Sequence, residues 1–128
     1  MLSPCYIVRM QTNDTQPPVI LLACDLMLSS SLLGVCRQLS RTMITAASAE
    51  AAIDLIDEHP DATLAVDLNT PLELQAFADK LPDDIKSQAV VFGPHVHVEK
   101  LKLARAVGFG TVTSRGDFVS NAATLLQK

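Results

Sequence analysis

Short, unbroken runs of apolar residues recur along the chain, and they constrain its fold more than any other feature. The longest covers residues 19–24, a similar run covers residues 89–92, and residues 62–66 form another that only Thr63 interrupts. A strand with one solvated face alternates apolar and polar residues, whereas a strand buried on both faces is apolar throughout. The runs therefore predict interior strands of a sheet that is covered by helices on both sides.

Segments with helical spacing lie between these runs. Two further strands are predicted at residues 42–47 and 111–113, which makes five. Apolar residues three or four positions apart follow each strand, as in Leu32, Cys36 and Leu39 after the first and Phe118, Ala122 and Leu126 after the last. Five strands that alternate with five helices predict an α/β fold with a parallel sheet and right-handed crossovers.

The ends of these helices carry recognisable signals. Hydroxyl groups at residues 29–31 and at Ser48 can cap the first two helices. Pro82 is expected to end the third helix, and Gly108 is expected to follow the end of the fourth.

Length, charge and cysteine content narrow the class of protein. A chain of 128 residues fits one domain, with residues 1–18 as a flexible lead-in that closes on two prolines and residues 19–128 as the domain. The formal charge of −4, with both signs interspersed, argues against nucleic acid or a membrane surface as a partner. No apolar run is long enough to span a bilayer, no signal-peptide pattern is visible, and the three cysteines lack metal spacing. We therefore expect a cytoplasmic protein.

Polar residues follow several of the predicted strands. In parallel α/β sheets, ligands bind at the carboxyl ends of the strands. This rule selects Cys24 and Asp25, residues 67–71, residues 93–95, and Ser114 with Arg115 as candidate site residues.

The segment Asp67-Leu68-Asn69-Thr70-Pro71 resembles the Asp-Leu-Asn-Met-Pro segment of response-regulator receivers, which act in bacterial two-component signalling. The resemblance extends over residues 19–128 in the order and spacing of elements. It implies a flavodoxin-like (βα)5 fold with strand order 2-1-3-4-5. It also implies that Asp67 is a phosphoacceptor for a histidine kinase. The alternative is that the Asp67 side chain caps a turn at Asn69 and Thr70.

The same resemblance implies a Mg²⁺ site beside the phosphoacceptor, formed with a pair of acidic residues after the first strand. Here that pair is Cys24 and Asp25, so the ligands would be Asp25, Asp67 and Asn69. A soft thiol is a poor Mg²⁺ ligand, and the loss of one carboxylate weakens the predicted site. No other cofactor is expected.

Two further positions depart from the receiver pattern. Receivers have a Ser or Thr at the end of the fourth strand, where this chain has Gly93. At the end of the fifth strand they have a Lys, where this chain has Arg115 beside Ser114, and these two residues are candidates for phosphate contact. The loop after Pro71 is also short. These departures indicate a degenerate receiver, or pseudo-receiver.

Cys24 supports a second alternative from another class. Its spacing to residues 29–31 resembles the phosphocysteine loop of B components of the sugar phosphotransferase system. The bulky segment 25–28, which includes a carboxylate, departs from that loop, and a buried thiol at a strand end is the simpler interpretation. His95, His97 and Glu99 could likewise suggest a metal site, but three neighbouring ligands are a weak pattern.

The function predicted from these patterns is a stand-alone regulatory module that acts by protein–protein contact, without regulated phosphorylation and without enzymatic activity. The alternatives are an active receiver that is phosphorylated on Asp67 and a phosphocysteine carrier that uses Cys24. In receivers the fourth helix, fifth strand and fifth helix commonly form the contact surface. We therefore expect an interaction surface at Val98, Leu101, Val112 and Phe118, with a histidine kinase or a second copy of the chain as partner.

Overall fold

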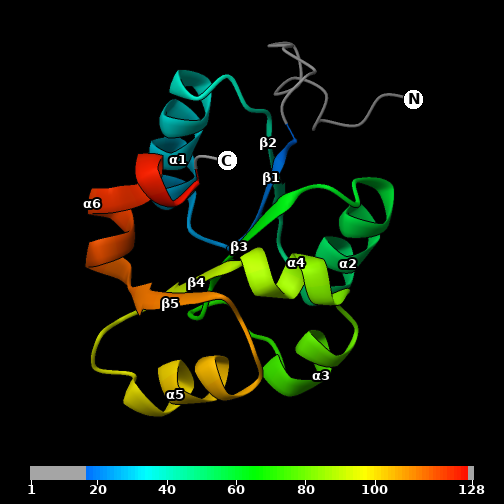
Figure 1. Ribbon diagram of the computed structural model, residues 1–128. Coiled ribbons are helices and arrows are strands. Elements are labelled where there is room, and N and C mark those ends of the chain that lie inside the picture. The colour runs from blue at the N-terminus through cyan, green and yellow to red at the C-terminus, as the bar shows by residue number, and fades with distance from the viewer. Residues whose placement is uncertain (1–16, 127–128) are drawn as a thin grey trace.

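The computed structural model describes residues 17–126 and contains one parallel sheet of five strands (Figure 1). The order is β2-β1-β3-β4-β5, which confirms the predicted fold class and strand order. The strands are β1 (Val19–Leu22), β2 (Met43–Ala46), β3 (Thr63–Asp67), β4 (Val90–Gly93) and β5 (Thr111–Ser114). Apart from its two prolines, the predicted lead-in lies outside the described residues.

Helices occupy every connection of the sheet. They are α1 (Leu26–Gln38), α2 (Ala49–Glu58), α3 (Leu74–Asp79), α4 (Asp83–Gln88), α5 (Val98–Ala106) and α6 (Arg115–Leu125). The described part of the chain thus has six helices where the sequence predicted five, because two short helices, α3 and α4, lie between β3 and β4.

The helix α4 gives Pro82 a role that the sequence analysis did not predict. The preceding helix, α3, ends at Asp79, before Pro82, and Pro82 is the N-cap of α4. A proline costs little there, because the first N–H groups of a helix have no partner within it. Asp83 and Asp84 in the first turn suit the positive end of the helix dipole. With Ile85 as the one buried residue of α4, the segment has no apolar stripe from which a helix could be predicted.

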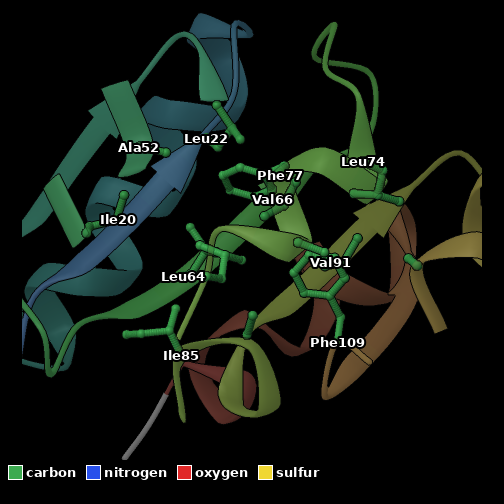
Figure 2. Close-up of a cluster of buried hydrophobic side chains, with 14 of the residues drawn as sticks. Ile20, Leu22, Ala52, Leu64, Val66, Leu74, Phe77, Ile85, Val91 and Phe109 are labelled. Atoms are coloured by element: carbon green, nitrogen blue, oxygen red, sulfur yellow. The ribbon is translucent and has the colours of Figure 1, made fainter. Parts of the chain in front are cut away.

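The two faces of the sheet carry separate apolar clusters. Ile20 and Leu22 of β1 pack into the cluster under α2, α3, α4 and α5, which Figure 2 shows. Val19 and Leu21 pack into the cluster under α1 and α6. Figure 1 shows α1 and α6 together on the left. Because successive side chains of a strand point to opposite faces, a strand between two helical layers must be apolar at every position.

The start of α1 also differs from the prediction. The helix begins at Leu26, and its N-cap is Asp25 rather than a serine at residues 29–31. The Asp25 carboxylate accepts hydrogen bonds from the backbone N–H groups of Met27 and Leu28, at 2.9 and 3.2 Å. The carboxylate satisfies two unpaired donors and lies at the positive end of the helix dipole. The other two caps are confirmed, since Ser48 caps α2 and Gly108 follows α5 with a φ of 102°.

The buried Arg41 joins both ends of the described chain. Its guanidinium donates hydrogen bonds to the carbonyl oxygens of Pro17 at 2.7 Å, Pro18 at 3.2 Å and Leu126, and to Thr63 Oγ1 at 2.9 Å. Burial lowers the pKa of this guanidinium below its ordinary value. Arg41 therefore holds the entry to β1, the start of β3 and the end of α6 together. No helix in residues 17–126 is long and apolar enough to cross a membrane.

Candidate functional site

A pocket of about 200 Å³ lies at the carboxyl ends of β1, β3 and β5. Its lining combines a thiol, two carboxylates, an amide, a hydroxyl and a guanidinium. The residues are Cys24, Asp25, Asp67, Asn69, Thr70 and Arg115. The structure thus brings together six of the residues that were selected at the strand ends, Thr70 among them.

Asp67 is the most buried of the charged groups in this pocket. Its side chain is 2% exposed. Oδ1 accepts a hydrogen bond from the Asn69 N–H at 2.9 Å, and the Thr70 N–H donates to the Asp67 carbonyl oxygen at 2.9 Å. The geometry is that of an aspartate that caps a turn, which is one of the two interpretations given by the sequence.

Asp25 is engaged through both of its carboxylate oxygens. Oδ1 caps α1, and Oδ2 accepts a hydrogen bond from the Arg115 guanidinium. The bond from Arg115, followed by that from the Leu28 N–H, holds the pKa of the Asp25 carboxyl below its ordinary range. Asp25 is therefore a charged group with a structural role at the edge of the pocket.

Arg115 links the two carboxylates. One terminal nitrogen of its guanidinium contacts Asp25 Oδ2, and the other lies 3.9 Å from Asp67 Oδ2. The side chain is 32% exposed and belongs to the first residue of α6. The sequence predicted Arg115 as a phosphate contact, and its pairing with both acids was missed because spacing along the chain does not reveal which side chains meet across the sheet.

Ser114, the other predicted phosphate contact, has a local partner. Its hydroxyl accepts a hydrogen bond from the Asp117 N–H at 3.2 Å and so caps α6. It is not among the residues that line the pocket. A serine directly before a helix commonly has this role.

Gly93 ends β4 at a place with little room for a side chain. A Cβ atom added there would lie 3.0 Å from Leu68 Cβ and 3.3 Å from Leu68 Cδ1. Leu68 is buried, and its N–H donates to the Phe92 carbonyl oxygen at 2.8 Å, which fixes its backbone beside β4. The absence of a hydroxyl at this strand end is thus matched by the packing of Leu68.

Cys24 lacks the surroundings that its second interpretation requires. The buried thiol given as the simpler interpretation was wrong as well, since the Cys24 thiol is exposed and donates to the Ala47 carbonyl oxygen at 3.6 Å. Because α1 begins at Leu26, the serines at residues 29–31 lie inside the helix, and the Ser29 hydroxyl donates back to the Asp25 carbonyl oxygen at 3.0 Å. The predicted placement of these hydroxyls at the helix start was wrong, because Asp25 is the better cap.

Thr70 belongs to the segment 67–71 that was selected at a strand end, but no role was predicted for its hydroxyl. Its side chain is buried, and its hydroxyl oxygen has no hydrogen-bond partner within residues 17–126. The signal available in the sequence is its position three residues after the aspartate at the strand end, since such a turn brings the chain back over that end.

The residues at this strand edge do not fit a Mg²⁺ ion. Mg²⁺ prefers near-octahedral oxygen coordination, and one of the two acidic positions after β1 holds the Cys24 thiol. Both remaining carboxylates, Asp25 and Asp67, are paired with Arg115. Nowhere in residues 17–126 do three or more His, Cys, Asp or Glu side chains form a group that could hold a metal. His97 is instead the N-cap residue of α5, outside this pocket.

The predicted interaction surface is only partly on the outside. Val98 is 50% exposed and Val112 is half-buried against the core. Leu101 and Phe118 are buried, and the Phe118 ring stacks on Phe92 with 4.0 Å between the ring centroids. The surface position predicted for Leu101 and Phe118 was therefore wrong, because these side chains attach α5 and α6 to the sheet.

Comparison with solved structures shows that the chain has the fold of response-regulator receiver domains. The crystal structure of response regulator RPA3017 in red-light signalling of R. palustris is similar with a TM-score of 0.67 and 15% identity, over 86% of this chain and 91% of that chain. The solution structure of the beryllofluoride-activated NtrC4 receiver domain dimer gives 0.65 and 17%, over 87% and 97%. The receiver domain from Rhodospirillum rubrum gives 0.64 and 12%, over 84% and 89%. No protein-family model matches the chain, and no curated protein matches it.

Proposed function

We propose that this domain is a pseudo-receiver, a signalling module that acts by binding protein partners and is not regulated by phosphorylation of Asp67. The proposal assigns the domain no enzymatic activity and no cofactor. The receiver fold supports a signalling module, and the residues at the carboxyl edge of the sheet support the absence of regulated phosphorylation.

The observation that carries the proposal is the packing at Gly93. The resemblance to the receiver family implies a Ser or Thr at this strand end, whose hydroxyl moves toward the phosphoryl oxygen after phosphorylation. Here the strand ends in a glycine, and a Cβ atom would approach Leu68 Cβ to 3.0 Å. A phosphoryl group on Asp67 would thus have no hydroxyl through which to move the segment that leads into α5.

The state of Asp67 supports the same proposal. Its carboxylate is 2% exposed, accepts a hydrogen bond from the Asn69 N–H, and lies 3.9 Å from the Arg115 guanidinium. A phosphodonor would have to reach a buried oxygen whose charge is already partly compensated. Both conditions disfavour nucleophilic attack by this carboxylate on a phosphorus atom.

The face formed by α5, β5 and α6 is the proposed contact surface. Its exposed apolar side chains are Val96, Val98 and Leu103 at α5 and Val119 on α6. Lys102 and Arg105 on α5 are exposed near Glu99 on the same helix. Because a two-fold interface pairs one patch with itself, a patch with both charges and apolar groups suits a second copy of the chain. The solved NtrC4 receiver is a dimer, and a histidine kinase is the alternative partner.

Intact mass spectrometry after incubation with acetyl phosphate and Mg²⁺ tests the phosphorylation part of the proposal. We expect no adduct on the wild-type chain. An adduct that is lost only in Asp67→Asn would identify an active receiver and contradict the proposal. An adduct lost only in Cys24→Ser would favour the phosphocysteine carrier.

Sedimentation velocity over a range of concentrations tests the contact surface. We expect a monomer–dimer equilibrium that Val98→Asp shifts to monomer. Leu26→Asp is the matched control, because Leu26 is also exposed but lies at the start of α1. A chain that stays monomeric at all concentrations would exclude the second copy as partner and direct the search to other proteins.

A further inference from the structure

We propose that Arg115 is an internal cation that takes the place of a divalent metal ion between Asp25 and Asp67 and keeps such ions out of the pocket. The inference concerns the pocket alone, and it holds whether or not the domain acts through α5, β5 and α6. It starts from the disagreement between the Mg²⁺ site that the receiver fold implies and the side chains found at this position.

Every oxygen of the two carboxylates already has a partner in the chain. Asp25 Oδ1 accepts hydrogen bonds from two N–H groups of α1, and Asp67 Oδ1 accepts one from Asn69. Asp25 Oδ2 faces one terminal nitrogen of Arg115, and Asp67 Oδ2 faces the other at 3.9 Å. A metal ion that bridged Asp25 Oδ2 and Asp67 Oδ2 would occupy the position of the guanidinium and would compete with it for these oxygens.

The charges of the pocket favour the guanidinium over an added ion. Two carboxylates face one cation that is covalently attached to the chain and that stays charged at any pH at which proteins fold. A divalent ion in the same place would be repelled by Arg115 and would have to lose bound water, which Mg²⁺ gives up reluctantly. The remaining side chains of the pocket, Cys24, Asn69 and Thr70, offer a thiol, a neutral amide and a neutral hydroxyl in return, and none of them adds a negative charge.

Arginine is suited to this task by its shape. Its planar fork presents two nitrogens that can face two different carboxylates at once, whereas a lysine ammonium is a compact point charge. Arg115 is the first residue of α6, Asp25 is the N-cap of α1, and Asp67 ends β3. The bridge therefore joins three elements and supplies internally the charge compensation that receivers obtain from a bound ion.

Titration of the ¹⁵N-labelled, full-length chain with Mn²⁺ tests this inference, with paramagnetic broadening of the amide signals of Asp25 and Asn69 as the readout. We expect no selective broadening in the wild type at millimolar Mn²⁺. In Arg115→Gln we expect selective broadening and an apparent affinity higher by about tenfold or more, which corresponds to ~1.4 kcal/mol. Arg37→Gln is the matched control, because it makes the same charge change at an exposed position of α1, outside the proposed contact surface.

Two results would overturn the inference. Selective broadening in the wild type as strong as in Arg115→Gln would mean that Arg115 does not exclude the ion. No broadening in either chain would mean that something other than Arg115 excludes it. Should Arg115→Gln not fold, Arg115→Lys replaces it, and we expect Mn²⁺ broadening there that the wild type lacks. Absence of a phosphoryl adduct leaves this inference unaffected, so its failure is distinguishable from that of the proposed function.

Discussion

Substitution of Gly93 by alanine tests whether the missing side chain at the end of β4 reflects packing. An added Cβ would lie 3.0 Å from Leu68 Cβ, whereas carbon atoms in contact prefer about 3.5–4.0 Å. Leu68 cannot retreat easily, because its side chain is buried and its N–H is bonded to Phe92 at 2.8 Å. Overpacking of this kind costs about 1–3 kcal/mol. For a domain of this size each kcal/mol corresponds to about 4 °C in Tm.

Thermal and urea unfolding followed by circular dichroism measure this cost, with Gly34→Ala as the matched control. Gly34 lies inside α1, and an added Cβ there meets nothing within 4 Å. Alanine in a helix interior is more favourable than glycine by about 0.5–1 kcal/mol, so Gly34→Ala should raise Tm. Gly93→Ala should lower it, and Gly93→Ser, which restores the hydroxyl of the receiver family, should lower it as well. If Gly93→Ala left the free energy of unfolding unchanged or increased it, the packing argument would be refuted.

Three further predictions concern other charged and titratable groups. Arg41→Met should lower the free energy of unfolding by about 3 kcal/mol, because it removes the hydrogen bonds that the guanidinium donates to the carbonyl oxygens of Pro17, Pro18 and Leu126. Urea denaturation measures this change, and the exposed control Arg37→Met should change the free energy by less than ~0.5 kcal/mol. Because the pKa of Asp25 is lowered in the folded state, its carboxylate stabilises the fold above the ordinary pKa of an aspartate, and this contribution is lost as pH falls through the lowered pKa. The difference in the free energy of unfolding between wild type and Asp25→Asn should therefore be largest near neutral pH and shrink under acid conditions. A difference that stays constant with pH would contradict the ion pair. Burial raises the pKa of Cys36 to about 11, so iodoacetamide near pH 8 should label the exposed Cys24 and spare Cys36 until urea unfolds the chain, as peptide mass mapping can check.

The sequence by itself determined the fold class. The run 19–24 is apolar at every position, and the run 62–66 at every position but Thr63, because β1 and β3 are buried on both faces. This pattern can be recognised without knowledge of any contact. The predicted strand ends also located the pocket. Asp25, Asp67 and Arg115 each lie where a strand ends, and parallel strands end at a common edge of the sheet. Asp25 as the cap of α1 could also have been read from the sequence, because it directly precedes the first helical turn.

Only the tertiary structure decided what these residues do to one another. The bridge from Arg115 to Asp25 spans 90 positions of the chain, and no periodicity or spacing encodes which of several strand-end charges will pair. The tight space at Gly93 depends on Leu68 at the neighbouring strand end, and Phe118 is buried where its ring stacks on Phe92. The local sequence pattern indicates which face of a helix or strand is apolar. A site, in contrast, is formed by side chains that come into contact across strands, and the register and packing of the whole sheet determine these contacts.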